Sequence, residues 1–220
     1  MNIEAKNLKL FVGLDHIWRQ SRTKSQFSEL KPILFLDRDG VIVDEVNYLH
    51  RISDVKFIAG VAETVVIARQ AGWRIAMITN QAGIGRGYYS WDEFAIVNQF
   101  ILECLDSQGA IIDAVLATPH HSEGINAYKH PNHIMRKPNP GMLLETAEML
   151  KGDLNNSLIV GDNVTDLLAG QRANLKQGFH VLTGHGTNYQ VESESLMTSD
   201  FNVQVISDIS DKRLRQVFKT

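Results

Sequence analysis

Two aspartates, Asp37 and Asp39, directly follow a short apolar run in the segment FLDRDG. Carboxylates this close repel each other when they converge, and a hard cation such as Mg²⁺ is their natural neutralising partner. Gly40 comes next and permits a tight backbone turn. Asp37 could attack phosphorus and form an aspartyl-phosphate, while Asp39 could give a proton to the leaving oxygen and take one from water. An ordinary surface turn rich in aspartate is the alternative.

A second polar segment, ITNQAGIGRG, contains Thr79, Asn80 and Arg86. A hydroxyl group and free backbone N–H groups in a glycine-rich turn suit phosphate oxygens. The segment lacks the Gly-Lys-Ser/Thr ending of a P-loop, which argues against a nucleoside triphosphatase. Arg86 adds a charge that could reach a second phosphate or another anionic group of a substrate.

Two later segments supply a lysine and further carboxylates. Lys137, in RKPNPG, precedes a predicted helix and could hold a phosphoryl group and steady the aspartate; a solvent-facing loop lysine is the alternative. Asp162, in IVGDNVTD, could complete a metal site with Asp37, and simple helix capping is its alternative. Asp166 follows one helical turn later and could pair with Lys137 or Asn80.

These segments are positioned by alternating strands and helices. The apolar runs predict buried strands at 33–37, 74–79, 114–118, 157–161 and 179–183, with a last strand at 203–206. Helices are expected at 61–71, from Ser90 to about 105, from Asn139-Pro140 to about 150, at 164–173 and at the end of the chain. This alternation predicts a parallel sheet covered by helices on both faces, with the ligand beyond the carboxyl ends of the strands.

The chain before the first strand is less regular. We expect residues 1–31 to form an extension in which Leu8, Phe11, Leu14, Ile17 and Trp18 share one face of an amphipathic helix. This helix would pack on the domain or on a partner subunit, or would cover the substrate. Residues 32–220 would form the main domain. Within it, residues 119–138 make a long connection with several histidines, and long loops are often functional.

Composition excludes several classes of protein. The chain has 220 residues, 22 Lys and Arg against 25 Asp and Glu, and 44% hydrophobic residues, as expected of one globular domain. Its near-neutral charge removes the electrostatic basis for nucleic-acid binding. Cys104 is the single cysteine, so neither an internal disulfide nor a thiolate zinc cluster can form. Without a bilayer-length apolar stretch or a secretory signal, we expect a soluble cytoplasmic protein with no membrane partner.

The motifs DRDG, ITN, the lysine and GDNVTD, in this order between about residues 33 and 184, resemble the haloacid dehalogenase (HAD) superfamily of phosphatases. The segments FLDRDGVIVDE, TNQAGIGRGYY, PHHSEG, RKPNPGM and VGDN are similar to the branch that contains D-glycero-D-manno-heptose 1,7-bisphosphate phosphatases and histidinol phosphatases. The resemblance implies an α/β, Rossmann-like three-layer sandwich with a mostly parallel sheet and no large cap domain. It implies a Mg²⁺-dependent phosphomonoesterase acting on a small sugar phosphate, with heptose 1,7-bisphosphate favoured.

The same resemblance implies roles for the candidate residues. Asp37 would be the nucleophile and Asp39 the acid and base. Asp37 and Asp162, with the backbone carbonyl of Asp39, would hold Mg²⁺, and Asp166 would support the site. The transferring phosphoryl group would contact Thr79 and Lys137, with Asn80 nearby. The rest of the substrate would contact Arg86 and Arg136. Histidinol phosphate or another small phosphomonoester is the alternative substrate, and a non-catalytic phosphosugar-binding protein is the alternative from another class.

One departure from that branch concerns its zinc loop, which has a Cys-x-His and a Cys-x-Cys pair. Here the matching positions are Thr118, His120, His133 and Met135, so the three thiolates are absent. Neither Thr nor Met is a good zinc ligand, and we expect no zinc. An improvised site that adds His121 and His130 to the two matching histidines is the alternative. The oligomeric state stays open between a monomer and a weak dimer.

Overall fold

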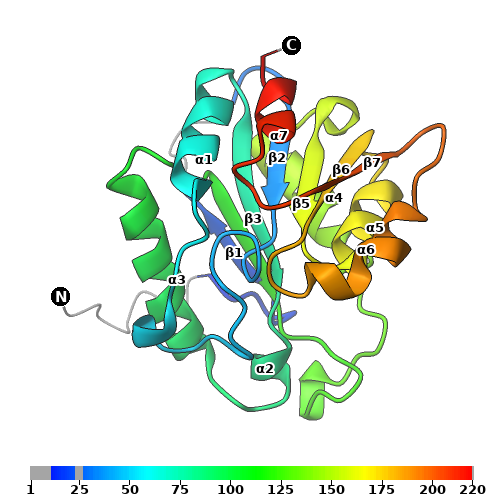
Figure 1. Ribbon diagram of the computed structural model, residues 1–220. Coiled ribbons are helices and arrows are strands. Elements are labelled where there is room, and N and C mark those ends of the chain that lie inside the picture. Colours follow the sequence, from blue (N-terminus) through cyan, green and yellow to red (C-terminus); the bar gives the residue numbers. More distant parts are fainter. Residues whose placement is uncertain (1–10, 23–26, 220) are drawn as a thin grey trace.

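A seven-stranded sheet forms the middle layer of the protein. The computed structural model describes residues 11–22 and 27–219 (Figure 1). The strands are β1 (Trp18–Ser21), β2 (Ile33–Leu36), β3 (Arg74–Asn80), β4 (Ala114–Thr118), β5 (Leu158–Gly161), β6 (Gln177–Val181) and β7 (Asn202–Ile206). Their order across the sheet is β1-β4-β3-β2-β5-β6-β7, and β2 lies in the centre. All neighbouring pairs are parallel except β1 and β4.

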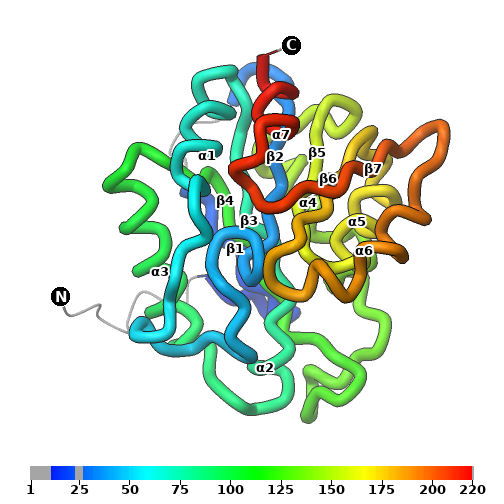
Figure 2. Tube along the Cα trace, in the orientation of Figure 1, coloured from blue at the N-terminus to red at the C-terminus, as the bar shows by residue number. Residues whose placement is uncertain are grey.

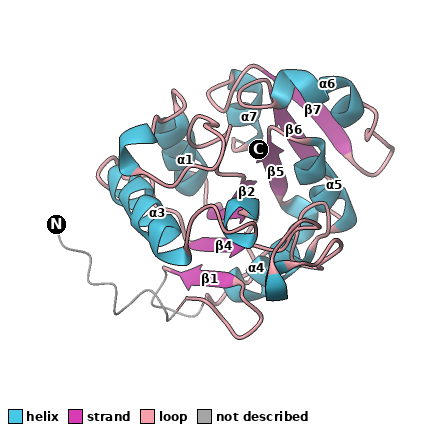
Figure 3. Cartoon of the chain, turned by 90° about the horizontal axis from the view of Figure 1, so that it is seen from below, coloured by secondary structure: helices cyan, strands magenta, loops and turns pink. Residues whose placement is uncertain are grey.

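Helices cover both faces of this sheet, as the end-on view in Figure 3 shows. The α-helices are α1 (Val61–Gln70), α2 (Ala82–Gly85), α3 (Trp91–Asp106), α4 (Gly141–Leu150), α5 (Val164–Arg172), α6 (Gly186–Glu194) and α7 (Lys212–Val217). Short 3₁₀ turns occur at Ile52–Asp54, Asn126–Tyr128 and Leu154–Asn156. Figure 2 traces the chain from the edge strand β1 to α7, which packs beside α1.

Side chains from each strand alternate between two hydrophobic cores. Leu34 and Leu36 of β2 point to the core formed with α1, α3 and α7. Ile33 and Phe35 of the same strand point to the core formed with α4 and α5. This alternation follows from the two-residue period of a strand. Because both faces of β2 are buried, its sequence is a continuous apolar run, and the predicted α/β three-layer fold is confirmed.

No large cap domain interrupts the described chain. Between β2 and α1 the backbone makes a compact turn in which Val43 forms bridges with Asp39 and with Phe57. The predicted strand and helix near the carboxyl end are confirmed as β7 and α7. The capping box of Ser90 and Glu93 is confirmed at the start of α3. None of the helices in the described part of the chain is both long enough and apolar enough to cross a bilayer.

Two local expectations are wrong. Residues 11–18 form turns and a bridge, and Trp18 begins an edge strand instead of belonging to an amphipathic helix; Leu8 lies outside the described residues. Helix α4 begins at Gly141, so Asn139 and Pro140 precede the helix instead of opening it. The amide of Asn139 instead donates hydrogen bonds to Asn132 Oδ1 and to the His133 carbonyl, so it is used to brace the preceding loop.

Candidate active site

The loops that follow β2, β3 and β5 meet the segment before α4 at one end of the sheet. They enclose a cavity of about 360 Å³. This is the carboxyl edge of the parallel strands, where α/β folds place their ligands. Eight of the nine candidate residues line the cavity: Asp37, Asp39, Thr79, Asn80, Arg136, Lys137, Asp162 and Asp166. The ninth, Arg86, lies outside it.

Lys137 is the buried cation of this cavity. Its Nζ lies 2.9 Å from Asp37 Oδ1 and 2.7 Å from Asp166 Oδ1, and it donates to the Ile78 carbonyl at 3.0 Å. Burial alone would lower the pKa of Lys137, but the two carboxylates more than offset this and raise the pKa above its ordinary value. The expected pairing of Asp166 with Lys137 is therefore present. Asp166 also caps α5, because its second oxygen accepts from the Asn163 N–H at 3.0 Å.

Three carboxylates converge beside this lysine. Asp37, Asp162 and Asp166 each offer an oxygen atom, and these atoms lie within 4.8 Å of one another. Burial raises the pKa of Asp162, and the charges of Asp166 and Asp37 raise it further. Burial likewise raises the pKa of Asp37, against the lowering effect of Lys137. A group of buried oxygen donors with this excess of negative charge fits a hard divalent cation.

The turn at Gly40 brings the first aspartate loop against Asp162. Gly40 has φ +78°, and a Cβ atom there would come within 3.0 Å of Asp162 Oδ2. The same oxygen accepts a 2.7 Å hydrogen bond from the His185 backbone N–H. A side chain at position 40 would therefore be strained and would also displace the carboxylate.

The end of β3 contributes a hydroxyl and an amide. Thr79 is buried, and its Oγ1 accepts a hydrogen bond from Gln81 Nε2 at 2.7 Å. Asn80 exchanges two hydrogen bonds with the backbone of Lys137, one to the carbonyl at 3.0 Å and one from the N–H at 3.1 Å. Asn80 thus fixes the lysine segment to the end of β3, and both side-chain polar atoms of Asn80 are engaged in doing so.

The two arginines occupy different positions. Arg136 lines the cavity, and its Nη1 donates to the His120 carbonyl at 2.9 Å. Burial lowers the pKa of Arg136, and the nearby charge of Arg86 lowers it further. The Arg86 guanidinium contacts Tyr48 Oη at 2.8 Å and forms an ion pair with Glu123. The two guanidinium groups are therefore near enough to repel each other, and an anion between them would relieve this repulsion.

Comparison with known proteins agrees with this geometry. A family profile described as HAD-hydrolase-like matches residues 134–211. Over 195 residues the chain is 37% identical to a D-glycero-beta-D-manno-heptose-1,7-bisphosphate 7-phosphatase of Mesorhizobium japonicum, covering 89% of this chain and 85% of that protein. The chain belongs to the HAD-like phosphatase family. The predictions of a phosphoric monoester hydrolase and of this fold are therefore confirmed.

Two solved structures resemble the phosphatase. A HAD-like phosphatase from Mesorhizobium loti superposes with a TM-score of 0.82 at 36% identity, covering 92% of this chain and 93% of that one. A D,D-heptose 1,7-bisphosphate phosphatase from B. bronchiseptica, solved with magnesium and phosphate, has a TM-score of 0.73 at 24% identity, with coverage of 86% and 98%. The second likeness supports the fold alone.

The histidine loop of this phosphatase is packed through its rings. The His120 and His133 rings stack with centroids 3.8 Å apart, and His130 meets His133 edge-on at 4.9 Å. His121 lies elsewhere, with Nε2 3.4 Å from an Arg86 nitrogen. In residues 11–22 and 27–219 the group of side chains close enough to share an ion is the aspartate trio, not these histidines. The absence of zinc stays a prediction.

Several residues in the cavity or next to it were not expected from the sequence. Glu45 and His185 both line the cavity of the phosphatase, and the structure also places Arg38 and Gln81 against Asp39. Their positions offered a signal, because Arg38 separates the two aspartates and Gln81 directly follows Asn80. Position alone does not show that a side chain turns inward, and these two depend on contacts between separate segments.

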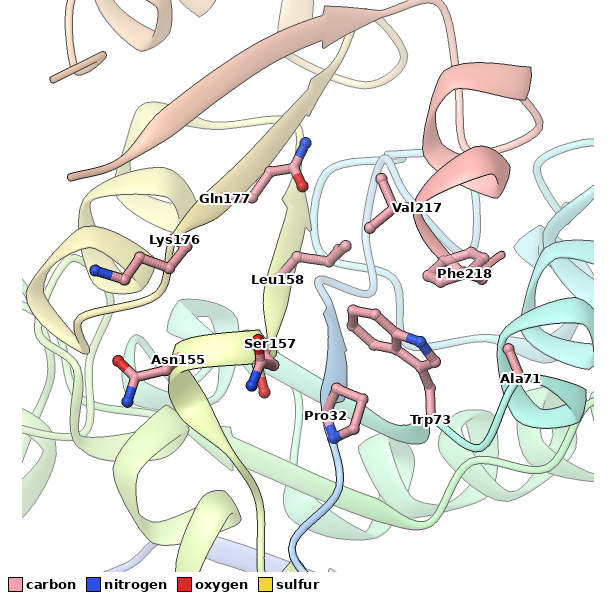
Figure 4. Close-up of a pocket in the computed structure, with 11 residues that line it drawn as sticks. Pro32, Ala71, Trp73, Asn155, Ser157, Leu158, Lys176, Gln177, Val217 and Phe218 are labelled. Atoms are coloured by element: carbon pink, nitrogen blue, oxygen red, sulfur yellow. The ribbon is translucent and has the colours of Figure 1, made fainter. Parts of the chain in front are cut away.

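A larger cavity, of about 460 Å³, lies at the amino ends of β2, β3, β5 and β6 (Figure 4). Trp73, Leu158 and Phe218 supply apolar walls, and Lys176 lies at its border. Among the described residues that line it, none carries a carboxylate, imidazole or thiol side chain. The candidate site, with its carboxylates and Lys137, lies at the opposite edge of the sheet.

Proposed function

We propose that the protein is a Mg²⁺-dependent phosphomonoesterase that removes the 7-phosphate of D-glycero-D-manno-heptose 1,7-bisphosphate. The observation that carries the proposal is the convergence of Asp37, Lys137 and Asp162 in one cavity at the carboxyl edge of the sheet. The similarity to a heptose-bisphosphate phosphatase over 89% of the chain supports the choice of substrate.

The reaction we propose has two steps, the formation and the hydrolysis of an aspartyl-phosphate. An Asp37 carboxylate oxygen attacks phosphorus while the bond between phosphorus and the leaving oxygen breaks, and Asp39 gives its proton to that oxygen. Water then attacks the aspartyl-phosphate and gives a proton to Asp39, which releases phosphate and restores Asp37. Lys137, 2.9 Å from Asp37, offsets negative charge near the phosphoryl group, while Thr79 offers a hydroxyl hydrogen bond.

The metal site we propose uses the carboxylates of Asp37 and Asp162 and the backbone carbonyl of Asp39, with Asp166 supporting Lys137. Mg²⁺ bound there supplies electrostatic stabilisation of the phosphoryl charge. The close approach of the aspartate oxygens, within 4.8 Å of one another, supports this assignment. Asp166 holds Lys137 in place through an ion pair at 2.7 Å. Lys137 in turn contacts the nucleophile Asp37 at 2.9 Å.

The remainder of the substrate is assigned to the arginines. Arg136 at the cavity wall and Arg86 nearby form a cationic rim suited to a second phosphate. Glu45 lies on the same cavity and would attract a cationic group instead, which keeps histidinol phosphate as the alternative substrate. A soluble cytoplasmic enzyme without nucleic-acid or membrane partners, as a monomer or weak dimer, remains our prediction.

Phosphate release from a substrate panel tests the proposal. With Mg²⁺, we expect one of the two anomers of heptose 1,7-bisphosphate to have the highest kcat/KM of the panel. This value should exceed the kcat/KM for histidinol phosphate. Asp37→Asn should lower turnover at least ~10³-fold because the nucleophile is lost. A higher kcat/KM for histidinol phosphate would favour the alternative substrate. If wild type and Asp37→Asn were equally inactive on every phosphate ester, the protein would be a phosphosugar-binding protein.

A further inference from the structure

Gln81 links the segments that follow two strands, next to the 360 Å³ cavity, through its contacts with Asp39 and Thr79, which line that cavity. It is almost fully buried, and its Nε2 donates to Asp39 Oδ2 at 3.2 Å and to Thr79 Oγ1 at 2.7 Å. One amide group therefore connects the loop after β2 to the end of β3. Both hydrogen atoms of this NH₂ group are used, each on a residue of the candidate site.

Tyr89 fixes the direction of this amide. The buried Tyr89 hydroxyl donates to Gln81 Oε1, so the amide oxygen is held on the side away from Asp39. A flipped amide would place that oxygen against the Asp39 carboxylate, where two acceptors would repel each other. Gly83 leaves room for the Tyr89 ring, because a Cβ atom at position 83 would collide with it.

Arg38 holds the Asp39 carboxylate from another side. Its guanidinium is fully buried and donates to Asp39 Oδ1 at 3.0 Å and to Oδ2 at 2.9 Å. It also lies over the Phe94 ring, 5.4 Å from the centroid. Arg38 thus holds both oxygen atoms of the Asp39 carboxylate, and the Gln81 amide ties one of them to the end of β3 as well.

We propose that Gln81, oriented by Tyr89, is a positioning residue that aims Asp39 for proton transfer to the leaving oxygen. This inference rests on the proposed function, in which Asp39 carries that proton. A carboxyl group transfers a proton efficiently only from hydrogen-bonding distance and in the right direction. Gln81 touches no reacting atom, and its effect passes through Asp39.

The leaving group distinguishes this role from simple structural support. Phenyl phosphate and p-nitrophenyl phosphate have nearly the same shape, but nitrophenolate is a stabilised anion that departs without a proton, whereas phenolate is helped by one. Loss of the general acid therefore slows the first substrate much more than the second. A general loss of active protein lowers both rates equally.

The test compares kcat/KM for these two substrates, with Mg²⁺ present, in wild type, Gln81→Leu and Tyr89→Phe. We expect kcat/KM of Gln81→Leu to fall ~10–100-fold on phenyl phosphate and less than ~3-fold on p-nitrophenyl phosphate. The larger loss is a part of the usual contribution of a general acid. Tyr89→Phe should change the ratio in the same direction by a smaller factor, because Gln81 remains. Gln99→Leu, at a partly exposed position on α3 where the amide contacts Glu103, should leave both values unchanged.

Three outcomes would overturn the inference. One is an equal loss on both substrates in Gln81→Leu, and another is unchanged activity on both. The third applies if Gln81→Leu fails to fold. In that case the milder variant Tyr89→Phe decides, and an unchanged ratio of kcat/KM for the two substrates in Tyr89→Phe would overturn the inference. Failure of the proposed phosphatase function would look different, since wild type would then release phosphate neither from these two esters nor from heptose 1,7-bisphosphate or histidinol phosphate.

Discussion

At the scale of single residues, the candidate site contains several charged side chains that are buried away from solvent. Lys137, Asp162 and Asp166 are all nearly inaccessible to solvent. Removing charged groups from water costs several kcal/mol for each ion, and ion pairs repay this only with good geometry. Lys137 has such geometry with Asp37 and Asp166, while Asp162 is left with a backbone N–H. The proposed cation and phosphoryl group would offset this imbalance of charge.

Gly40 and Gly72 give a matched test of how this charge is positioned. Both have positive φ, but a Cβ atom would meet Asp162 at position 40 and nothing within 4 Å at position 72. Gly72→Ala should cost ~1–2 kcal/mol of unfolding free energy through backbone strain alone and keep full kcat. Gly40→Ala should cost more and lose most activity. Urea unfolding and phosphate release check this, and equal activity in both variants would contradict it.

The candidate residues were predictable because they lie at the ends of predicted strands. Asp37, Thr79 and Asp162 each lie where an apolar run ends, and parallel strands bring such ends to one edge. Gln81 and Arg38 were not predictable in this way, because their roles depend on a contact with Asp39. Arg86 was placed in the site by its charge, but its ion pair with Glu123 lies outside the main cavity.

At the scale of elements, the amino-terminal segment shows how helical spacing can mislead. Phe11, Leu14 and Trp18 have the spacing of a helix face, yet Leu14 is fully exposed and Trp18 is buried. Trp18 begins β1 and stacks with Trp91 at 5.8 Å and against Phe94 at 5.2 Å. Tertiary packing and pairing with β4 decide the structure, because a strand at the sheet edge satisfies backbone hydrogen bonds that β4 would otherwise leave exposed.

Variants at Trp18 and Leu14 distinguish the observed edge strand from an amphipathic helix. Trp18→Ala should lower the unfolding free energy by ~3–5 kcal/mol, as expected for a large aromatic side chain removed from a core. Leu14→Ala should change it by less than ~0.5 kcal/mol, because this side chain contacts solvent. Chemical denaturation checks both values. Comparable losses in the two variants would indicate an amphipathic helix with a shared buried face.

The histidine loop predicts a dependence of stability on pH. Burial, together with His120 and His130, lowers the pKa of His133 to about 4. An unfolded chain has an ordinary histidine pKa of ~6.5, so between these values the unfolded state binds more protons. The stability contributed by neutral His133 is therefore present above ~6.5 and is lost as the pH falls toward 4.

The variant His133→Phe isolates this contribution. Phenylalanine keeps a ring that can stack on His120 but cannot take up a proton. We expect the loss of unfolding free energy between pH 7.5 and 5, measured in urea, to be smaller in the variant than in wild type. Buried Asp37 and Asp162 act with the opposite sign, but they are common to both proteins and cancel in the difference. Identical losses would contradict the role assigned to His133.

At the scale of the whole molecule, the order of the strands in the sheet explains how the candidate site is assembled. Central β2 lies between β3 and β5, so the loops after these three strands are neighbours. The segment before α4 then covers them with Lys137, tied to β3 through Asn80. The alternation of strands and helices predicted this layout. The position of β1 beside β4 could not be predicted, since it requires an antiparallel contact from an irregular segment.

A molecule arranged in this way should trade stability for function at Asp162. Without a cation, the buried Asp162 carboxylate faces the charges of Asp166 and Asp37, which raise its pKa. Asp162→Asn keeps the shape and removes one negative charge, so we expect a metal-free variant at least as stable as wild type. In wild type, Mg²⁺ at 100 times its Kd should add ~2.7 kcal/mol to the unfolding free energy, and the variant should lose most of this gain. Thermal unfolding with EDTA and with Mg²⁺ measures both effects. Equal Mg²⁺ stabilisation of the two proteins would place the cation elsewhere, because a site without Asp162 would not respond to its removal.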